Sequence, residues 1–125
     1  MSIIKKDVIV AGMKKEEKLN ALIDTGSSAN YIKKSIADRI SAIPPPKKIK
    51  TKTVVGNGSI IEGETAGIFV KVDDCSTMIP VIVHDDNKMT EDIILGVGFM
   101  QSLHAEIDMK EDTFEIKRCI PFQMI

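Results

Sequence analysis

Residues 21–27 read Ala-Leu-Ile-Asp-Thr-Gly-Ser, so an apolar run ends in a carboxylate that stands directly before turn-forming residues. This order predicts a buried strand that places Asp24 on a tight turn. Burial of a carboxylate costs free energy unless it serves a function, which makes Asp24 the first candidate for chemistry. A second stretch, Ile93-Ile94-Leu95-Gly96, follows about 70 residues later and is apolar up to its glycine, as expected of a short buried strand.

A glycine-rich segment lies between these two stretches. Val54-Val55-Gly56-Asn57-Gly58-Ser59-Ile60-Ile61 places turn residues between two apolar, β-branched pairs, which predicts a hairpin. Taken alone, the hairpin is equally compatible with an ordinary solvent-exposed turn, and Asp-Thr-Gly-Ser is compatible with a turn that has no chemical role. The ordered combination of all three features is more specific than any one of them.

Composition favours one mainly β domain. The chain has 125 residues, the size of a single domain, of which 43% are hydrophobic and 28% are charged. Twenty isoleucines and nine valines stand against four leucines, and β-branched residues suit strands better than helices. We expect residues 1–125 to form one domain of short strands with one or two small helices.

Charge and hydropathy exclude several classes of partner. The 17 basic and 18 acidic residues give a net charge of -1, so no long-range field favours nucleic acid or an anionic membrane. The lysines at 47, 48, 50 and 52 are interpreted as the solvated face of a strand. No apolar run approaches the ~20 residues that span a bilayer, and the N-terminus lacks the pattern of a signal peptide. These features predict a cytosolic-type environment.

Metal and disulfide sites are not expected. Cys75 and Cys119 are too few for a zinc site or a disulfide framework and are interpreted as ordinary thiols in a reducing compartment. His84 and His104 are expected in loops or at strand edges. The acidic segment 84–92 lacks the central glycine and final glutamate of a calcium loop, so it is predicted to be a solvated loop.

The periodicity also predicts the order of the elements. Ser27-Ser28-Ala29-Asn30 is expected to cap a short helix in which Ile32, Ile36 and Ile40 share one face. Pro44-Pro45-Pro46 ends this helix. Strands are expected near residues 3–10, 19–25, 47–55, 60–72, 78–83, 93–96, 105–109 and 113–117, with one or two helical turns at 98–103.

The Asp-Thr-Gly-Ser turn, the hairpin and the apolar-apolar-Gly strand, in this order, resemble the retropepsin-like aspartic proteases of retroviruses, LTR retrotransposons and plant pararetroviruses. The resemblance covers about residues 18–117. It implies a closed β-barrel that is completed as a symmetric homodimer. Independently of the resemblance, aspartic proteolysis needs two carboxylates that share a proton, and this chain has one Asp-Thr-Gly.

The resemblance also implies roles for individual residues. Asp24 corresponds to the catalytic aspartate, Thr25 to the residue that cross-bonds the two active-site loops, and Gly26 to a contact with the peptide backbone. The residues expected to bind substrate are Ser27 and Ser28 on the same turn, Gly56, Asn57, Gly58, Ser59, Ile60 and Ile61 in a flap, and Ile94 in a side-chain pocket.

The sequence departs from the retroviral pattern at the turn. Ser28 and Val97 stand where retroviral enzymes usually carry an aspartate and an arginine that form an ion pair, so we expect a weak dimer. Ser27 matches the pepsin-like form, in which the hydroxyl donates to the catalytic carboxylate and favours its ionised form.

The predicted function is therefore an aspartic endopeptidase without a cofactor. It would act as a homodimer on a peptide, in the family on a viral or retroelement polyprotein, in the host-cell cytoplasm or a virus-like particle. The alternative is a catalytically silent relative of the same fold that serves as a dimerisation or peptide-binding module.

Overall fold

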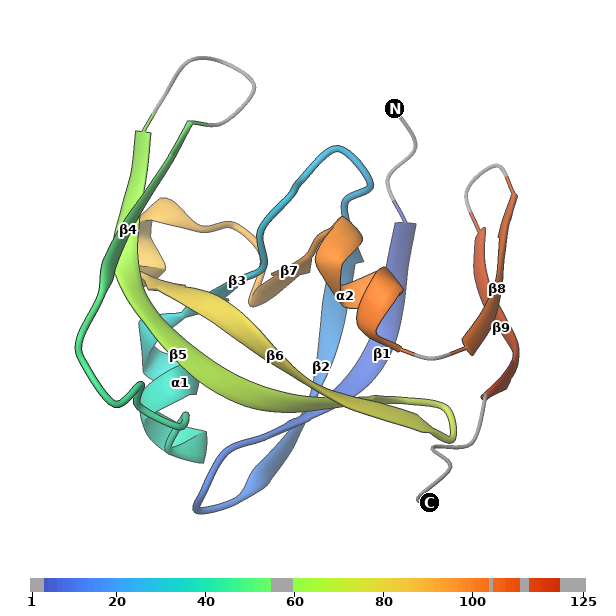
Figure 1. Cartoon of the computed structure of the whole chain (residues 1–125), viewed down its shortest axis with the longest axis horizontal. Coiled ribbons are helices and arrows are strands. Elements are labelled where there is room, and N and C mark those ends of the chain that lie inside the picture. The colour runs from blue at the N-terminus through green and yellow to red at the C-terminus, as the bar shows by residue number, and fades with distance from the viewer. Residues whose placement is uncertain (1–3, 55–59, 104, 111–112, 120–125) are drawn as a thin grey trace.

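The computed structural model describes residues 4–54, 60–103, 105–110 and 113–119. In these residues the chain is mainly β, as the isoleucine and valine content predicted. Two short helices and one 3-10 turn connect the strands (Figure 1). The strands are β1 Ile4–Ala11, β2 Glu16–Ile23, β3 Tyr31–Lys33, β4 Lys50–Val54, β5 Ile60–Val72, β6 Cys75–His84, β7 Ile93–Leu95, β8 Ala105–Lys110 and β9 Thr113–Cys119; the helices are α1 Lys34–Ile40 and α2 Val97–Ser102, and the 3-10 turn is η1 Asp86–Lys88.

Six of the strands close into a barrel, which confirms the predicted architecture. The main sheet has the order β1-β2-β7-β3-β6-β5-β4, and β1 also pairs with β5, so the first six strands of this order form a ring. The closing contact is short, because it joins only residues 9–11 of β1 to residues 69–71 of β5. β4 lies outside the ring and pairs with β5 as the predicted hairpin.

Apolar side chains from all sides of the barrel fill its interior. Ile23, Ile32, Ile68 and Ile93 come from four different strands and are fully buried. Phe99 of α2 is also fully buried and packs into the same core. Burial of one such side chain stabilises the fold by roughly 1.5–3 kcal/mol, so this interior is the main source of the stability of the barrel.

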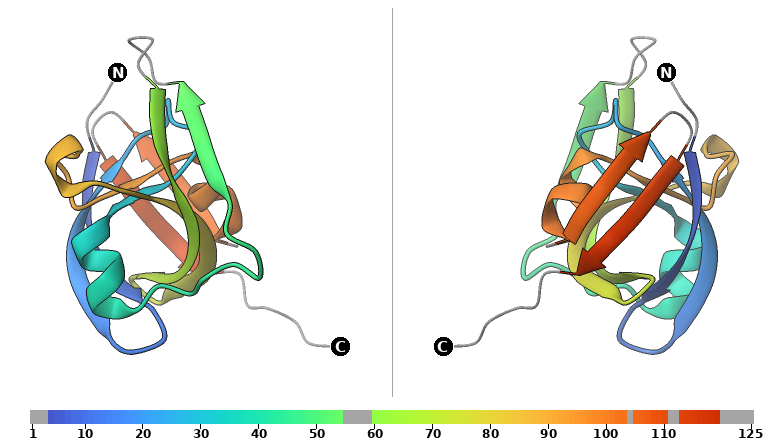
Figure 2. Two further views of the ribbon diagram at one scale, coloured as in Figure 1. Left: turned by 90° about the vertical axis from the view of Figure 1, so that its left-hand side faces the viewer. Right: turned by 90° about the vertical axis from the view of Figure 1, so that its right-hand side faces the viewer.

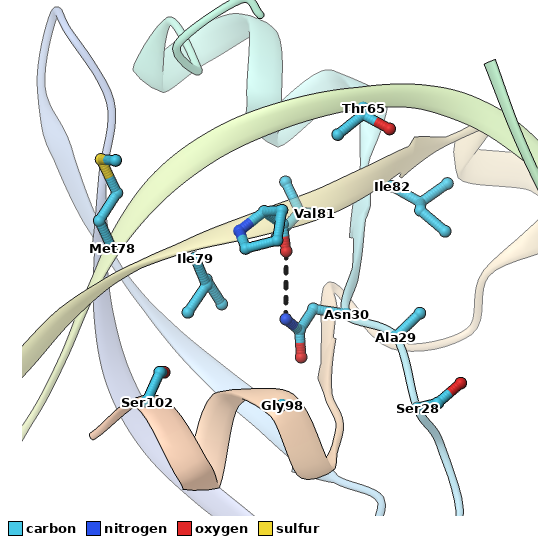
Figure 3. Close-up of a pocket in the computed structure, with 11 residues that line it drawn as sticks. Ser28, Ala29, Asn30, Thr65, Met78, Ile79, Val81, Ile82, Gly98 and Ser102 are labelled. Atoms are coloured by element: carbon cyan, nitrogen blue, oxygen red, sulfur yellow. Dashed lines mark hydrogen bonds between the residues drawn. The ribbon is translucent and has the colours of Figure 1, made fainter. Parts of the chain in front are cut away.

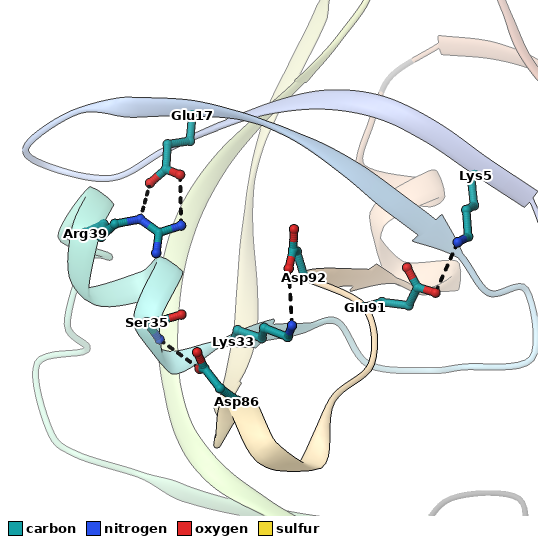
Figure 4. Close-up of polar contacts among 8 residues, drawn as sticks. All are labelled: Lys5, Glu17, Lys33, Ser35, Arg39, Asp86, Glu91 and Asp92. Carbon is teal, nitrogen blue, oxygen red and sulfur yellow. Dashed lines mark hydrogen bonds and ion pairs between the residues drawn. The ribbon is translucent and has the colours of Figure 1, made fainter.

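The helix α1 differs from the sequence prediction. Ile32 lies in β3, and the helix begins only at Lys34, so the Ser27–Asn30 segment does not cap it. Lys33 occupies the N-cap position without a side-chain cap hydrogen bond. Instead, Oδ1 of Asp86 accepts a hydrogen bond of 3.0 Å from the main-chain N–H of Ser35 (Figure 4). The helix therefore takes its cap from a segment about 50 residues away in the sequence.

Contacts with the β1–β2 hairpin hold the other end of α1. The helix ends at Ile40, and its C-cap residue Ser41 has a left-handed φ of 59°. The main-chain N–H of Met13 donates to the Ser41 carbonyl at 2.7 Å, and that of Lys14 donates to the Ile40 carbonyl at 3.1 Å. The hairpin turn thus satisfies carbonyls that a helix C-terminus leaves without partners.

The acidic segment 84–92 makes specific contacts and is not simply solvated. Besides Asp86, Glu91 pairs with Lys5 of β1 at 3.3 Å, and Asp92 pairs with Lys33 of β3 at 3.3 Å (Figure 4). Hydrogen bonds from the Ser35 hydroxyl and main-chain N–H lower the pKa of Asp86. The segment therefore links the helix to the barrel strands.

Arg39 joins α1 to β2 through a two-pronged contact. Its Nε and Nη2 atoms each donate to an oxygen of the Glu17 carboxylate at 3.0 Å (Figure 4). The hydrogen bond from Arg39 lowers the pKa of Glu17. Such paired geometry fixes the relative orientation of the two side chains.

The C-terminal strands form a separate hairpin, as predicted. β8 and β9 pair only with each other in the described residues and lie beside β1 at the flank of the barrel (Figure 2). Ile116 of β9 packs against the barrel core. No helix in the described part of the chain has the length and apolar character needed to cross a membrane.

Two predictions about single side chains are wrong. Cys75 is buried and disulfide-bonded, whereas the sequence was interpreted as having ordinary thiols. The second cysteine, Cys119, ends β9. His84 is the last residue of β6, which lies between β3 and β5, so it is neither in a loop nor at a strand edge of the sheet, and it is buried. His104 lies outside the described residues. The argument from free thiols to a reducing compartment therefore does not hold.

Candidate active site

The Asp24 turn begins where β2 ends. Ile23 is fully buried, and the next residue, Asp24, is half-buried, so its carboxylate is less enclosed than the sequence predicted. The main-chain N–H of Asp24 donates to the Leu95 carbonyl at 2.9 Å. The Gly26 N–H donates to Oδ1 of Asp24 at 2.9 Å. These contacts fix both the main chain and the carboxylate while Thr25 and Gly26 stay exposed.

The apolar-apolar-Gly strand lies directly beside this turn. β7 runs parallel to β2, with Leu22 opposite Ile94 and Ile23 opposite Leu95. Two stretches that are about 70 residues apart in the sequence are thus neighbours in the barrel.

Gly96 follows β7 at the point of closest approach. A Cβ atom placed on it would lie 2.4 Å from the Ser27 carbonyl oxygen and 2.6 Å from that of Ala29. Both oxygens belong to the main chain of the active-site turn, so a side chain at residue 96 would displace the turn. The close approach explains why this stretch ends in glycine.

Ser27 does not make the predicted contact with the Asp24 carboxylate. Its Oγ donates to the Ala29 carbonyl at 2.8 Å. A serine hydroxyl has one proton to donate, so the expectation that Ser27 donates to Asp24 is wrong for this conformation. Ser27 instead stabilises the turn that follows Asp24.

The other predicted site residues lie in several elements. Ser28 is exposed on the turn, and Ile94 of β7 packs against a small cluster of Tyr31, Ile82 and Met89. Ile60 and Ile61 begin β5 and pair with Val54 and Thr53 of β4. Gly56, Asn57, Gly58 and Ser59 lie outside the described residues.

Comparison with known proteins is consistent with this geometry. A family model described as "gag-polyprotein putative aspartyl protease" matches residues 10–102. The chain belongs to this family. Among solved structures, EIAV protease complexed with the inhibitor HBY-793 is similar in fold, with a TM-score of 0.63 and 19% identity over 86% of this chain and 94% of that one.

A further solved structure is similar to the chain, with a lower TM-score. A Legionella pneumophila protein of unknown function (DUF785) has a TM-score of 0.49 and 16% identity over 81% of this chain and 87% of its own. No curated protein sequence matches the chain. The family model and the retroviral protease fold together show a retropepsin-like aspartic protease fold.

In this gag-type protease chain, a cavity of about 410 Å³ lies next to the active-site turn (Figure 3). One wall is the end of the turn, residues 28–30, and the opposite wall is formed by residues 78–82 of β6. Gly98 and Ser102 of α2 are small and leave the space open. The cavity is therefore bounded by the same turn that carries Asp24.

Asn30 is the residue of this region that the sequence interpretation missed. It was assigned to a helix cap, but its side chain is buried and forms hydrogen bonds with two other segments. The available signal was its position, because an amide directly before the apolar Tyr31-Ile32 pair is carried into the interior by the strand that follows.

Proposed function

We propose that this chain is an aspartic endopeptidase in which two copies form one active site. The observation that carries the proposal is Asp24, held at the end of a buried strand by the Leu95 carbonyl and the Gly26 N–H. One Asp-Thr-Gly turn per chain supplies one carboxylate. Peptide hydrolysis by the aspartic mechanism requires a pair of carboxylates, so a symmetric dimer would bring Asp24 of each copy together.

The proposed mechanism uses water and the two carboxylates. With one proton shared between them, the ionised carboxylate takes a proton from the attacking water, and the protonated one donates to the substrate as the tetrahedral intermediate forms. Thr25 would link the two turns across the dimer. The chemistry requires neither a metal nor an organic cofactor.

The proposed substrate is an extended peptide that adds to the sheet as a strand. Gly26, Ser27 and Ser28 would contact its backbone from the turn, and residues 56–61 would cover it as a flap. Ile94 would line a side-chain pocket. The exposure of Thr25, Gly26 and Ser28 supports this part of the proposal, because these groups are available to a ligand.

We infer polyprotein processing as the biological role. The description of the matched family refers to a gag polyprotein, which supports a viral or retroelement precursor as the substrate. Such a protease would act in the host-cell cytoplasm or a virus-like particle. Residues 1–125 would work as one domain, since the C-terminal hairpin contributes Ile116 to the barrel core.

Replacement of the catalytic carboxylate tests the proposal. Asp24→Asn should lower kcat/KM on a cleavable fluorogenic peptide by at least about a hundredfold, because an amide cannot act as the base for water. The peptide would be selected from a pooled library with the wild-type protein. Asp38→Asn is the matched control, because Asp38 is exposed on α1 and pairs with Lys34.

The control should keep wild-type activity, and both variants should keep the wild-type circular dichroism spectrum. Activity of purified Asp24→Asn within tenfold of wild type would exclude the mechanism. A folded wild-type dimer that cleaves no peptide in the library would favour the silent binding module.

A further inference from the structure

Asn30 is a buried amide with an assigned partner on each side. The residue as a whole is 6% exposed. Oδ1 accepts from the Gly96 main-chain N–H at 2.8 Å, and Nδ2 donates to the Pro80 carbonyl at 3.1 Å (Figure 3 shows the second bond). The Asn30 carbonyl also accepts from the Ile82 N–H at 2.8 Å. One residue thus joins the active-site turn to β6 and to the start of α2.

The contact with Gly96 completes a row of three hydrogen bonds. The Asp24 N–H donates to the Leu95 carbonyl, the Gly96 N–H donates to the Asn30 side chain, and the Val97 N–H donates to the Ser27 carbonyl at 2.9 Å. Consecutive residues 95, 96 and 97 therefore contact both ends and the middle of the turn. Of these three hydrogen bonds, only the one from the Gly96 N–H to Asn30 depends on a side chain.

The groups that hold the turn against residues 95–97 are uncharged. Ser28 and Val97, the positions of the ion pair described above, carry no charge here. The Asn30 amide connects the same two segments, because the turn and the β7–α2 junction meet at its Oδ1 contact. Both amide partners are main-chain groups, so their charge does not change with pH.

We propose that Asn30 is a positioning residue of the aspartic protease: its amide holds the active-site turn against Gly96 and Pro80, and thereby holds Asp24 in the position needed for catalysis. This inference rests on the proposed function. The two contacts of Asn30 require one acceptor and one donor on the same planar group. Among side chains of this shape, only an amide or a neutral carboxylic acid supplies both.

The requirement for a donor gives a pH-dependent test with Asn30→Asp. When protonated, the carboxyl can accept from Gly96 and donate to Pro80; when ionised, it has no proton for Pro80 and places a negative charge beside a carbonyl oxygen. Burial favours the neutral form of a carboxyl group. Relative to wild type at the same pH, kcat should be nearly unchanged in acid and should fall at least about tenfold as the new carboxyl ionises.

The measurement is kcat and KM of wild type, Asn30→Asp and Asn30→Ala on one fluorogenic peptide, with the folded fraction recorded at each pH. Asn30→Ala should lose kcat at every pH. Asn20→Asp is the matched control, because Asn20 is exposed and its side chain donates to Asp7 of β1 at 3.0 Å, not to the turn. Its kcat ratio to wild type should not vary with pH.

Three results would overturn the inference. These are kcat of both Asn30 variants within threefold of wild type throughout, a loss that follows only the folded fraction, or a pH-independent ratio for Asn30→Asp. Failure of the proposed function gives a different pattern, in which wild type and Asp24→Asn are equally inactive, and that pattern overturns both proposals.

Discussion

At the scale of single residues, the site depends on main-chain geometry as much as on the carboxylate. Gly96 and Asn30 carry no catalytic group, yet both limit where the Asp24 turn can lie. Gly96 has no side chain, so its main chain can lie directly against the turn. The Asn30 side chain accepts the hydrogen bond from the Gly96 N–H at this contact. A carboxylate alone is therefore an incomplete description of the proposed active site.

Gly96→Ala should reduce activity because the new methyl group would lie 2.4 Å from the Ser27 carbonyl oxygen. The turn must shift to relieve this overlap, and crowding of this kind typically costs about 1–3 kcal/mol of stability. We expect kcat/KM to fall at least about tenfold, since small displacements of reacting groups slow catalysis strongly. Peptide hydrolysis and thermal unfolding measure the two effects.

Gly67→Ala is the matched control for this substitution. A Cβ atom at residue 67 would lie 3.6 Å from Cβ of Ile43, an ordinary contact distance. Gly67 lies within β5, where alanine costs less backbone entropy than glycine. The control should keep both activity and stability, and equal behaviour of the two alanine variants would refute the steric explanation.

At the scale of elements, the acidic segment is part of the structure of α1. Asp86 accepts the Ser35 N–H, and the lowered pKa of Asp86 means that folding favours its ionised form. The stabilisation is therefore present above the unfolded-state pKa of about 3.9 and is lost as pH falls through the folded-state value.

Asp86→Ala should lower the melting temperature by a few degrees at pH 7. The difference from wild type should begin to shrink below about pH 4 and vanish as the wild-type carboxylate becomes protonated through its lowered folded-state pKa. Asp85→Ala is the control, because Asp85 is exposed and makes no side-chain cap hydrogen bond with η1. A difference for Asp86→Ala that stays constant down to pH 2 would contradict the role of the charge.

The elements also show why the sequence predicted some features and missed others. Most of the strands other than β3, the β4–β5 hairpin and α2 follow from local patterns of apolar and turn residues, and the family resemblance supplied the barrel. The cap of α1 and the contacts of Asn30 depend on partners 50 to 66 residues away in the sequence. Periodicity carries no information about such pairs, so the polar residues between Asp24 and β3 were assigned to the nearest helix.

Ser27 illustrates the same limit at shorter range. Its hydroxyl has two possible acceptors within the turn, and the sequence pattern resembled enzymes in which it serves the carboxylate. The turn geometry instead directs it to the Ala29 carbonyl. The main-chain path from Asp24 to Asn30 determines which acceptor the Ser27 hydroxyl reaches. Hydrogen bonds with the neighbouring β7–α2 junction hold this path in place.

At the scale of the whole molecule, activity should depend on association of two chains. Specific activity should fall on dilution, because each dimer contributes two copies of Asp24 and a monomer has one. Because Ser28 and Val97 cannot form an ion pair, we expect a weak dimer. The loss of specific activity should therefore begin at protein concentrations that an activity assay can reach. Sedimentation at micromolar concentration and a dilution series of activity measure association and function together.

Mixing with an inactive chain sharpens this test. Under conditions that favour dimers, an equal amount of Asp24→Asn should reduce the activity of a fixed amount of wild type to about half, since random pairing places half of the wild-type chains in mixed dimers. Full activity from a species that remains monomeric would refute the two-chain site.

Closure of the barrel through β1 has a consequence for fragments of this protein. The region matched by the family model begins at residue 10, yet β1 starts at Ile4 and is the strand that joins β2 to β5. A protein trimmed to the matched region would lose residues 4–9 of β1 and leave the backbone donors and acceptors along most of β2 open, while β5 would keep only the short contact with residues 10 and 11. Open edges of this kind recruit strands from other chains. Such a fragment would keep Asp24 and the whole Asp-Thr-Gly turn, and we expect it to aggregate instead of forming an enzyme.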